Sequence, residues 1–254
     1  MTGAGGTVGA TGLTQIQRFS LSRDPVSSLS TFGPLPAAVQ EIGALPSSLD
    51  GIIGLSFLNQ FDCVDMDFEK GQISLYQPSG GVGNSSSEKP HTSAPIVARA
   101  PMDYVSSLGL YTVNVYFDGR GPVKMLVDSG AAHTFLNWKG VQDLGISRSD
   151  TSILQRISNP MAAMGSDNVS MELTHRLVVS NALQIGKATN NNLPGLSLDT
   201  GSARRLNVDI GDIAILEQLR SDNVGGILGI DALMLCSRVS FSFRGATKEL
   251  ILYN

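Results

Sequence analysis

Charged and aromatic side chains are both scarce in this sequence. Charged residues make up 16% of the 254 positions and aromatic residues 6%, whereas charged residues account for about 25% of an average soluble domain. The net charge of −4 offers no basic surface for nucleic acid or for anionic lipid. No apolar run approaches the roughly 20 residues that a membrane-spanning helix needs. We therefore expect a soluble protein that neither binds nucleic acid nor spans a membrane.

Metal ligands and targeting signals are lacking as well. The two cysteines, Cys63 and Cys236, lie far apart in the sequence, and the three histidines are equally scattered. This spacing predicts no metal site and no other cofactor, and it favours buried free thiols at both cysteines. The first residues, MTGAGGTVGATG, have neither the basic region nor the apolar region of a secretory signal. The cellular compartment stays open.

Glycine and proline, in contrast, are frequent, with 28 and 11 residues. Many turn-forming residues and few charges are typical of a compact β protein. Gly3, Gly6 and Gly9 match the spacing of a dinucleotide-binding fingerprint, but that site needs a strand before the glycines and a helix after them. Neither pattern is found there, so we interpret residues 2–22 as a turn-rich hairpin.

An internal repeat organises the chain. Residues 51–68 read GIIGLSFLNQFDCVDMDF, and residues 226–243 read GILGIDALMLCSRVSFSF. Both blocks are followed by an alternating strand, QISLY at 72–76 and ELILY at 249–253. The offset from Gly51 to Gly226 is 175 positions, and it also pairs identical residues at five further places: Ile52, Gly54, Leu58, Val64 and Phe68 with Ile227, Gly229, Leu233, Val239 and Phe243.

Each copy is predicted to contain an apolar glycine-rich strand, a short helix and a hairpin. The helices are expected at 55–62 and 231–237, with a further helix at 138–144. The acidic residues Asp62, Asp65, Asp67 and Glu69 alternate along the first hairpin, so we expect them to face solvent.

The two copies differ in their front halves. Before its glycine-rich strand, the second copy has an alternating strand at 110–117, a turn at DGRG and a strand at 122–127, and the first copy has no equivalent. We therefore predict a truncated half-lobe at 1–77, a Gly/Ser/Pro-rich linker at 78–100 and a complete lobe at 101–254.

The chemistry is predicted to lie in the complete lobe. The segment MLVDSGAAHTFLN, residues 125–137, is an apolar strand that leads into a turn at Asp128-Ser129-Gly130-Ala131. It resembles the active-site loop of retropepsin-like aspartic proteases. The second signature of that family is an apolar-apolar-Gly strand, and Ile227-Leu228-Gly229 is similar to it. The resemblance implies an all-β fold with a few short helices, built from acid-protease lobes of the pepsin and retropepsin kind.

The resemblance also implies a reaction, the hydrolysis of peptide bonds by an aspartic endopeptidase. Such an enzyme activates a water molecule between two carboxylates that share one proton. Asp128 would supply one of them, with Ser129, Gly130 and Ala131 shaping the loop and Gly229 in the strand behind it. The expected substrate is an extended peptide or protein, bound as an added strand.

The sequence contains one convincing loop of this kind, although the reaction needs two. A homodimer could supply the second loop, an upstream half-lobe segment could supply it, or the chain could be an inactive peptide-binding module or transposon remnant. Asp199-Thr200-Gly201 spells a similar motif, but no apolar strand precedes it, so we assign it to an ordinary loop.

A flap should close over the bound peptide. The candidate lies between the two signatures of the complete lobe, where turn-forming residues precede an alternating strand. Its tip is predicted at Gly165, Ser166, Asp167 and Asn168. His133, next to the loop, is expected to face solvent rather than to act as a base.

Overall fold

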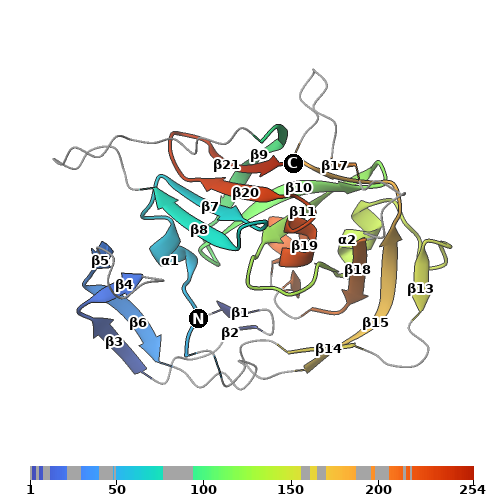
Figure 1. Ribbon diagram of the computed structural model, residues 1–254. Coiled ribbons are helices and arrows are strands. Elements are labelled where there is room, and N and C mark those ends of the chain that lie inside the picture. Colours follow the sequence, from blue (N-terminus) through green and yellow to red (C-terminus); the bar gives the residue numbers. More distant parts are fainter. Residues whose placement is uncertain are drawn as a thin grey trace.

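The structure is a computed structural model. It describes residues 2–3, 6–7, 12–21, 30–39, 48, 50–76, 94–155, 161–164, 170–186, 196–197, 206–213, 216–217 and 219–254. The described part is mainly β-structure with a few short helices, as predicted (Figure 1).

In the described part of the chain, fifteen strands form one large sheet. These strands are β7 (Cys63–Asp67), β8 (Gln72–Tyr76), β9 (Ile96–Val105), β10 (Leu110–Phe117), β11 (Arg120–Val127), β12 (Phe135–Leu136), β13 (Ile153–Gln155), β14 (Met161–Met164), β15 (Ser170–Val179), β16 (Ala182–Ile185), β17 (Leu196–Ser197), β18 (Leu206–Gly211), β19 (Val224–Leu228), β20 (Arg238–Ser242) and β21 (Lys248–Tyr253).

The remaining strands form three separate hairpins. They are β1 (Thr2–Gly3) with β2 (Gly6–Thr7), β3 (Gly12–Ile16) with β6 (Leu35–Val39), and β4 (Phe19–Leu21) with β5 (Ser30–Phe32). The short helices are α1 (Leu55–Leu58), α2 (Trp138–Asp143) and α4 (Ile230–Leu233), with a 3-10 turn, η1 (Arg220–Asp222). The three α-helices lie where the sequence predicted helices and are shorter than expected, whereas η1 was not predicted. No helix in the described part is long and apolar enough to cross a membrane.

The strand order of the sheet runs β13-β15-β18-β12-β19-β11-β10-β9-β21-β20-β7-β8. The buried apolar residues form two clusters, and the larger one contains fully buried side chains such as Val115, Met125, Leu228 and Leu250. The hairpin β10–β11 turns where the sequence DGRG predicted, because Asp118 and Gly119 both adopt positive φ. Strand β9 begins at Ile96, so the last residues of the range predicted as a linker belong to the sheet.

The two sequence copies fold alike. Hairpins β7–β8 and β20–β21 each contain five residue pairs in the same register. Cys63 lies opposite Tyr76 in the first hairpin, and its counterpart Arg238 lies opposite Tyr253 in the second. Helices α1 and α4 are each preceded by an extended glycine, Gly54 at φ −89° and ψ 172° in the first and Gly229 at φ −87° and ψ 179° in the second. The helix and the hairpin of the repeat are therefore repeated in the structure. The predicted glycine-rich strand forms in the second copy as β19, and residues 51–54 of the first copy form no strand.

A local two-fold axis relates the copies where β7 pairs with β20. Asp65 lies opposite Ser240, which is its own counterpart at the offset of 175. Two equivalent hydrogen bonds flank this point, since the Phe68 N–H donates to the Ser237 carbonyl and the Phe243 N–H donates to the Asp62 carbonyl, both at 2.9 Å. The antiparallel pairing is therefore symmetric in the backbone.

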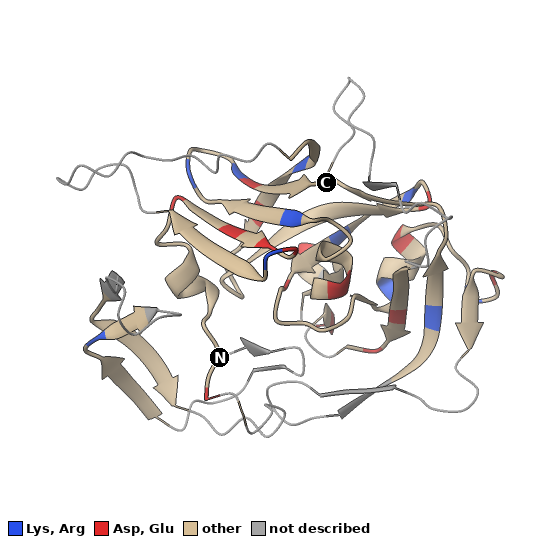
Figure 2. Ribbon diagram, viewed as in Figure 1, with Lys and Arg blue, Asp and Glu red and all other residues tan. Residues whose placement is uncertain are grey.

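The side chains at this axis are not symmetric. Asp65 is 1% exposed and accepts hydrogen bonds from Arg238 Nε at 2.7 Å and from Ser240 Oγ at 2.6 Å. Figure 2 shows the acidic and basic positions side by side on β7 and β20. The prediction that Asp65 faces solvent is wrong. Cys63, Val64 and Asp65 are all buried, so both faces of β7 are covered here, and a cation of the second copy compensates the charge of Asp65.

Candidate active site

The Asp128 loop directly follows strand β11, which pairs with β19. The two strands pair in parallel, with Val127 opposite Leu228, and the Asp128 N–H donates to the Leu228 carbonyl at 3.0 Å. The last three residues of β11 and all of β19 are apolar or glycine, and they pack in the core, with Leu126 2% exposed and Leu228 fully buried. The loop therefore begins where two paired and buried strands end.

Within the loop, Asp128 accepts a hydrogen bond on one carboxylate oxygen. Gly130 N–H donates to Asp128 Oδ1 at 2.9 Å, and the Ala131 N–H donates to the Asp128 carbonyl at 3.1 Å. A Cβ atom added to Gly130 would lie 3.1 Å from Asp128 Oδ1, so glycine leaves room for the close approach. Oδ2 makes no hydrogen bond within the described part of the chain, and the side chain is half-buried.

Hydrogen bonds between Thr134 and Asp231 hold the C-terminal end of the loop. Thr134 is fully buried. Its hydroxyl donates to Asp231 Oδ1 at 2.6 Å and accepts from the Gly229 N–H at 3.1 Å, while its own N–H donates to Asp231 Oδ2 at 3.1 Å. Three hydrogen bonds thus join the loop to the segment that follows β19. Neither Thr134 nor Asp231 was predicted as a site residue.

Gly229 lies directly behind the loop. A Cβ atom there would come within 2.3 Å of the His133 carbonyl oxygen and 2.9 Å of the Ala131 carbonyl oxygen. Ala131 also accepts a hydrogen bond from the Ile230 N–H at 2.8 Å. No side chain fits between these backbones, which explains physically why the apolar-apolar-Gly pattern ends in glycine.

The other residues near the loop have simpler surroundings. Ser129 is half-buried, and its hydroxyl makes no hydrogen bond to a described residue. The His133 side chain is 47% exposed, with Nδ1 3.9 Å from Asp231 Oδ2. The predicted flap tip, Gly165 to Asn168, lies outside the described residues, although β14 and β15 form the hairpin that leads to it. Asp199-Thr200-Gly201 also lies outside them.

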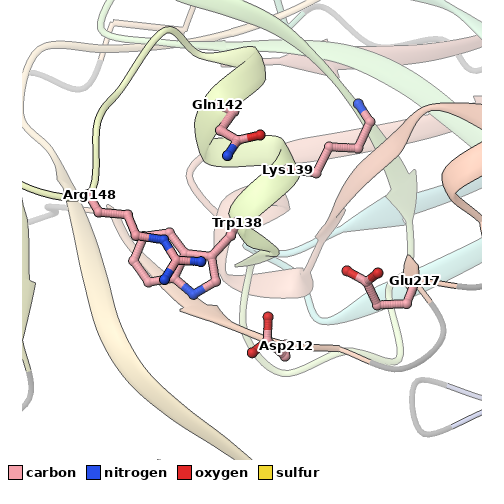
Figure 3. Close-up of a pocket in the computed structure, with 6 residues that line it drawn as sticks. All are labelled: Trp138, Lys139, Gln142, Arg148, Asp212 and Glu217. Atoms are coloured by element: carbon pink, nitrogen blue, oxygen red, sulfur yellow. The ribbon is translucent and has the colours of Figure 1, made fainter.

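A hollow of about 420 Å³ lies beside α2 (Figure 3). The Arg148 guanidinium stacks on the Trp138 ring, 4.3 Å from its centre, and the lining includes acidic and basic side chains. None of the lining residues belongs to the Asp128 loop, so this hollow is separate from the loop. Among the described residues, no three His, Cys, Asp or Glu side chains are grouped to hold a metal ion.

A lone carboxylate limits the chemistry of this loop. No second Asp or Glu side chain in the described part hydrogen-bonds to Asp128. The loop can therefore position one carboxylate, and a reaction that needs a pair requires a further loop from elsewhere.

Comparisons with known proteins agree with the geometry. Residues 113–232 match the family model described as aspartyl protease. A search of solved structures found the crystal structure of a retropepsin-like aspartic protease from Rickettsia conorii, at 16% identity and a TM-score of 0.34, covering 65% of this chain and 96% of that one. No curated protein matched. The segment 113–232, which is similar to aspartyl proteases, contains both the Asp128 loop and Gly229.

Proposed function

We propose that this chain supplies one half of the active site of an aspartic endopeptidase, with Asp128 as its catalytic carboxylate. The observation that carries the proposal is the way the loop is held. Hydrogen bonds between Thr134 and Asp231 fix its backbone, while Asp128 Oδ2 makes no hydrogen bond to a described residue. A preorganised carboxylate with a free oxygen is what water activation requires.

The reaction follows from pairing this carboxylate with a second one. Two carboxylates within hydrogen-bond distance share one proton, because both cannot ionise at low cost. The ionised member accepts a proton from water as the water attacks the peptide carbonyl, and the protonated member donates to the departing groups. Asp128 is one member, and a further Asp loop from a second chain or another segment is the other.

The substrate of the proposed enzyme is an extended peptide. Such a peptide binds by adding its backbone as a strand, while side-chain pockets set the preference. The hairpin β14–β15 is positioned in the sequence between the two signatures, as a flap would be. The alternative is a module that binds a peptide without cutting it, which the single described loop favours.

The test uses the chain isolated from its own cells through a tag after the exposed Asn254, so that any polypeptide carrying the second loop stays bound. A mixed peptide library is incubated with this preparation from about pH 4 to 7. We expect cleavage with a bell-shaped pH dependence, the signature of one acid and one base. Saturable peptide binding without cleavage would instead identify the peptide-binding module.

A further inference from the structure

The first copy contains a surface that its counterpart in the second copy buries. Ile52 and Ile53 are 60% and 47% exposed, whereas their counterparts Ile227 and Leu228 are 2% and 0% exposed. In the second copy, β11 and β12 cover this segment from both sides. Among the described residues, no strand pairs with residues 51–54.

The glycines of this segment point to the same conclusion. A Cβ atom on Gly226 would lie 2.5 Å from the Phe135 carbonyl oxygen, and one on Gly229 would lie 2.3 Å from the His133 carbonyl oxygen. Among the residues that the structure describes, nothing lies within 4 Å of a Cβ atom added to their counterparts Gly51 and Gly54. Gly54 nevertheless has the same extended backbone as Gly229.

Close approach of another backbone would explain glycine at Gly51 and Gly54, while the contacts of the described residues do not require it. Neither residue has positive φ, so a larger side chain would fit the present conformation. The hydrogen bonds that Leu228 and Gly229 make with the Asp128 loop have no equivalent at Ile53 and Gly54 within the described residues. Residues 51–54 therefore have the backbone of a binding segment, and the polypeptide that would bind there is not among the described residues.

We infer that residues 51–54 dock a polypeptide segment with the chemistry of residues 120–137, an apolar strand followed by an Asp-Ser/Thr-Gly turn and a second short apolar strand. The second copy supplies the template for this occupant, because the same Gly-Ile-x-Gly backbone holds β11, the Asp128 loop and β12 there. This inference rests on the proposed function, since the docked segment would carry the second carboxylate.

A second copy of this chain is not the expected occupant. Its own segment 120–137 is embedded in its sheet, where Val123, Met125 and Leu136 are fully buried. The edge of β20, where two complete lobes would pair about a two-fold axis, is already covered by β7 of the same chain. Asp65 and Arg238 fit only this pairing, because two β20 strands in the same register would place Ser240 opposite Ser240 and leave both arginines without the buried carboxylate.

The experiment measures docking rather than cleavage, so it can fail independently of the proposed function. The probe is a synthetic, fluorescently labelled peptide with the sequence of residues 120–137, titrated with the full chain and followed by fluorescence anisotropy. A control peptide carries Phe135→Ser and Leu136→Ser. We expect saturable binding of the probe, protection of the amides near Ile52 from hydrogen exchange, and no binding of the control peptide.

Two glycine variants separate docking from folding. Gly54→Ala should leave the unfolding temperature unchanged and weaken probe binding at least about tenfold, since its Cβ would meet the incoming backbone. Gly229→Ala, the matched change in the second copy, should lower the unfolding temperature. Equal binding by wild type and Gly54→Ala, or no saturable binding by wild type, would overturn the inference. A dimer of the chain that Gly54→Ala dissociates would also overturn it, because the occupant would then be a second copy.

Discussion

The buried ion pair at the local two-fold axis gives the sharpest stability prediction. Asp65→Ala removes a carboxylate that is 1% exposed and bonded to Arg238 and Ser240. The Arg238 side chain is only 13% exposed, so its charge would remain largely buried without a carboxylate partner. Breaking one partner of a buried pair costs about 3–5 kcal/mol. In a chain of this size each kcal/mol shifts the unfolding temperature by about 2–4 °C, so we expect a decrease of about 6–20 °C.

Calorimetry of the full chain measures this loss, and Asp67→Ala is the matched control on the same strand. Asp67 pairs with Lys70 at 3.0 Å, but the Lys70 side chain is 69% exposed, and exposed pairs contribute at most about 1 kcal/mol. Replacing both partners, as Asp65→Leu with Arg238→Met, should cost less than Asp65→Ala alone because no charge is left buried. Equal effects of Asp65→Ala and Asp67→Ala would refute the reasoning.

Three other predictions concern the loop, the helix contact and the thiols. Thr134→Val should lower the free energy of unfolding by about 1–3 kcal/mol, since it removes the hydroxyl hydrogen bond to Asp231 and leaves the Gly229 N–H without its acceptor; urea titration measures it. Gly140→Ala should destabilise the lobe in the same titration, because its Cβ would lie 2.2 Å from the Gly225 carbonyl oxygen. Burial raises the pKa of Cys63 to about 11 and that of Cys236 to about 12, so an alkylating reagent at pH 8 should modify neither thiol in the folded chain. Unfolded thiols ionise at their ordinary pKa of 9.0, so the protonated, buried thiols favour the folded state. Their contribution to stability should be complete below pH 9 and be lost as the pH rises from 9 to about 12. Thermal unfolding across that pH range measures the loss, and unchanged stability would contradict it.

Much of the fold was predictable because strand periodicity and turn chemistry are local signals. The strands at 110–117 and 72–76 alternate, and both were predicted at the bounds that the structure has. The repeat predicted two copies with the same elements, and the structure confirms the short helix and the hairpin in both, down to the register of the hairpins. The predicted glycine-rich strand forms in the second copy as β19, whereas residues 51–54 form no strand. Both cysteines are buried free thiols, as expected.

The polar contacts of the core were not predictable from single positions. Asp65 lies in an alternating acidic run, and its burial depends on Arg238, which is 173 residues away. Thr134 and Asp231 lie 97 positions apart, and each could be an ordinary surface residue when considered alone. The available signal was a polar residue next to an apolar run in each signature, which identifies a position but not its partner.

The most direct test of the central claim is the change of one atom in the loop. Asp128→Asn keeps the Oδ1 acceptor for Gly130 but removes the ionisable oxygen, so the unfolding temperature should match that of the wild type. We measure cleavage of the peptide library by the preparation from native cells, with Asp103→Asn, an exposed carboxylate on β9, as the control. The account predicts that cleavage is lost in Asp128→Asn and retained in Asp103→Asn. Continued cleavage by a folded Asp128→Asn variant would contradict it.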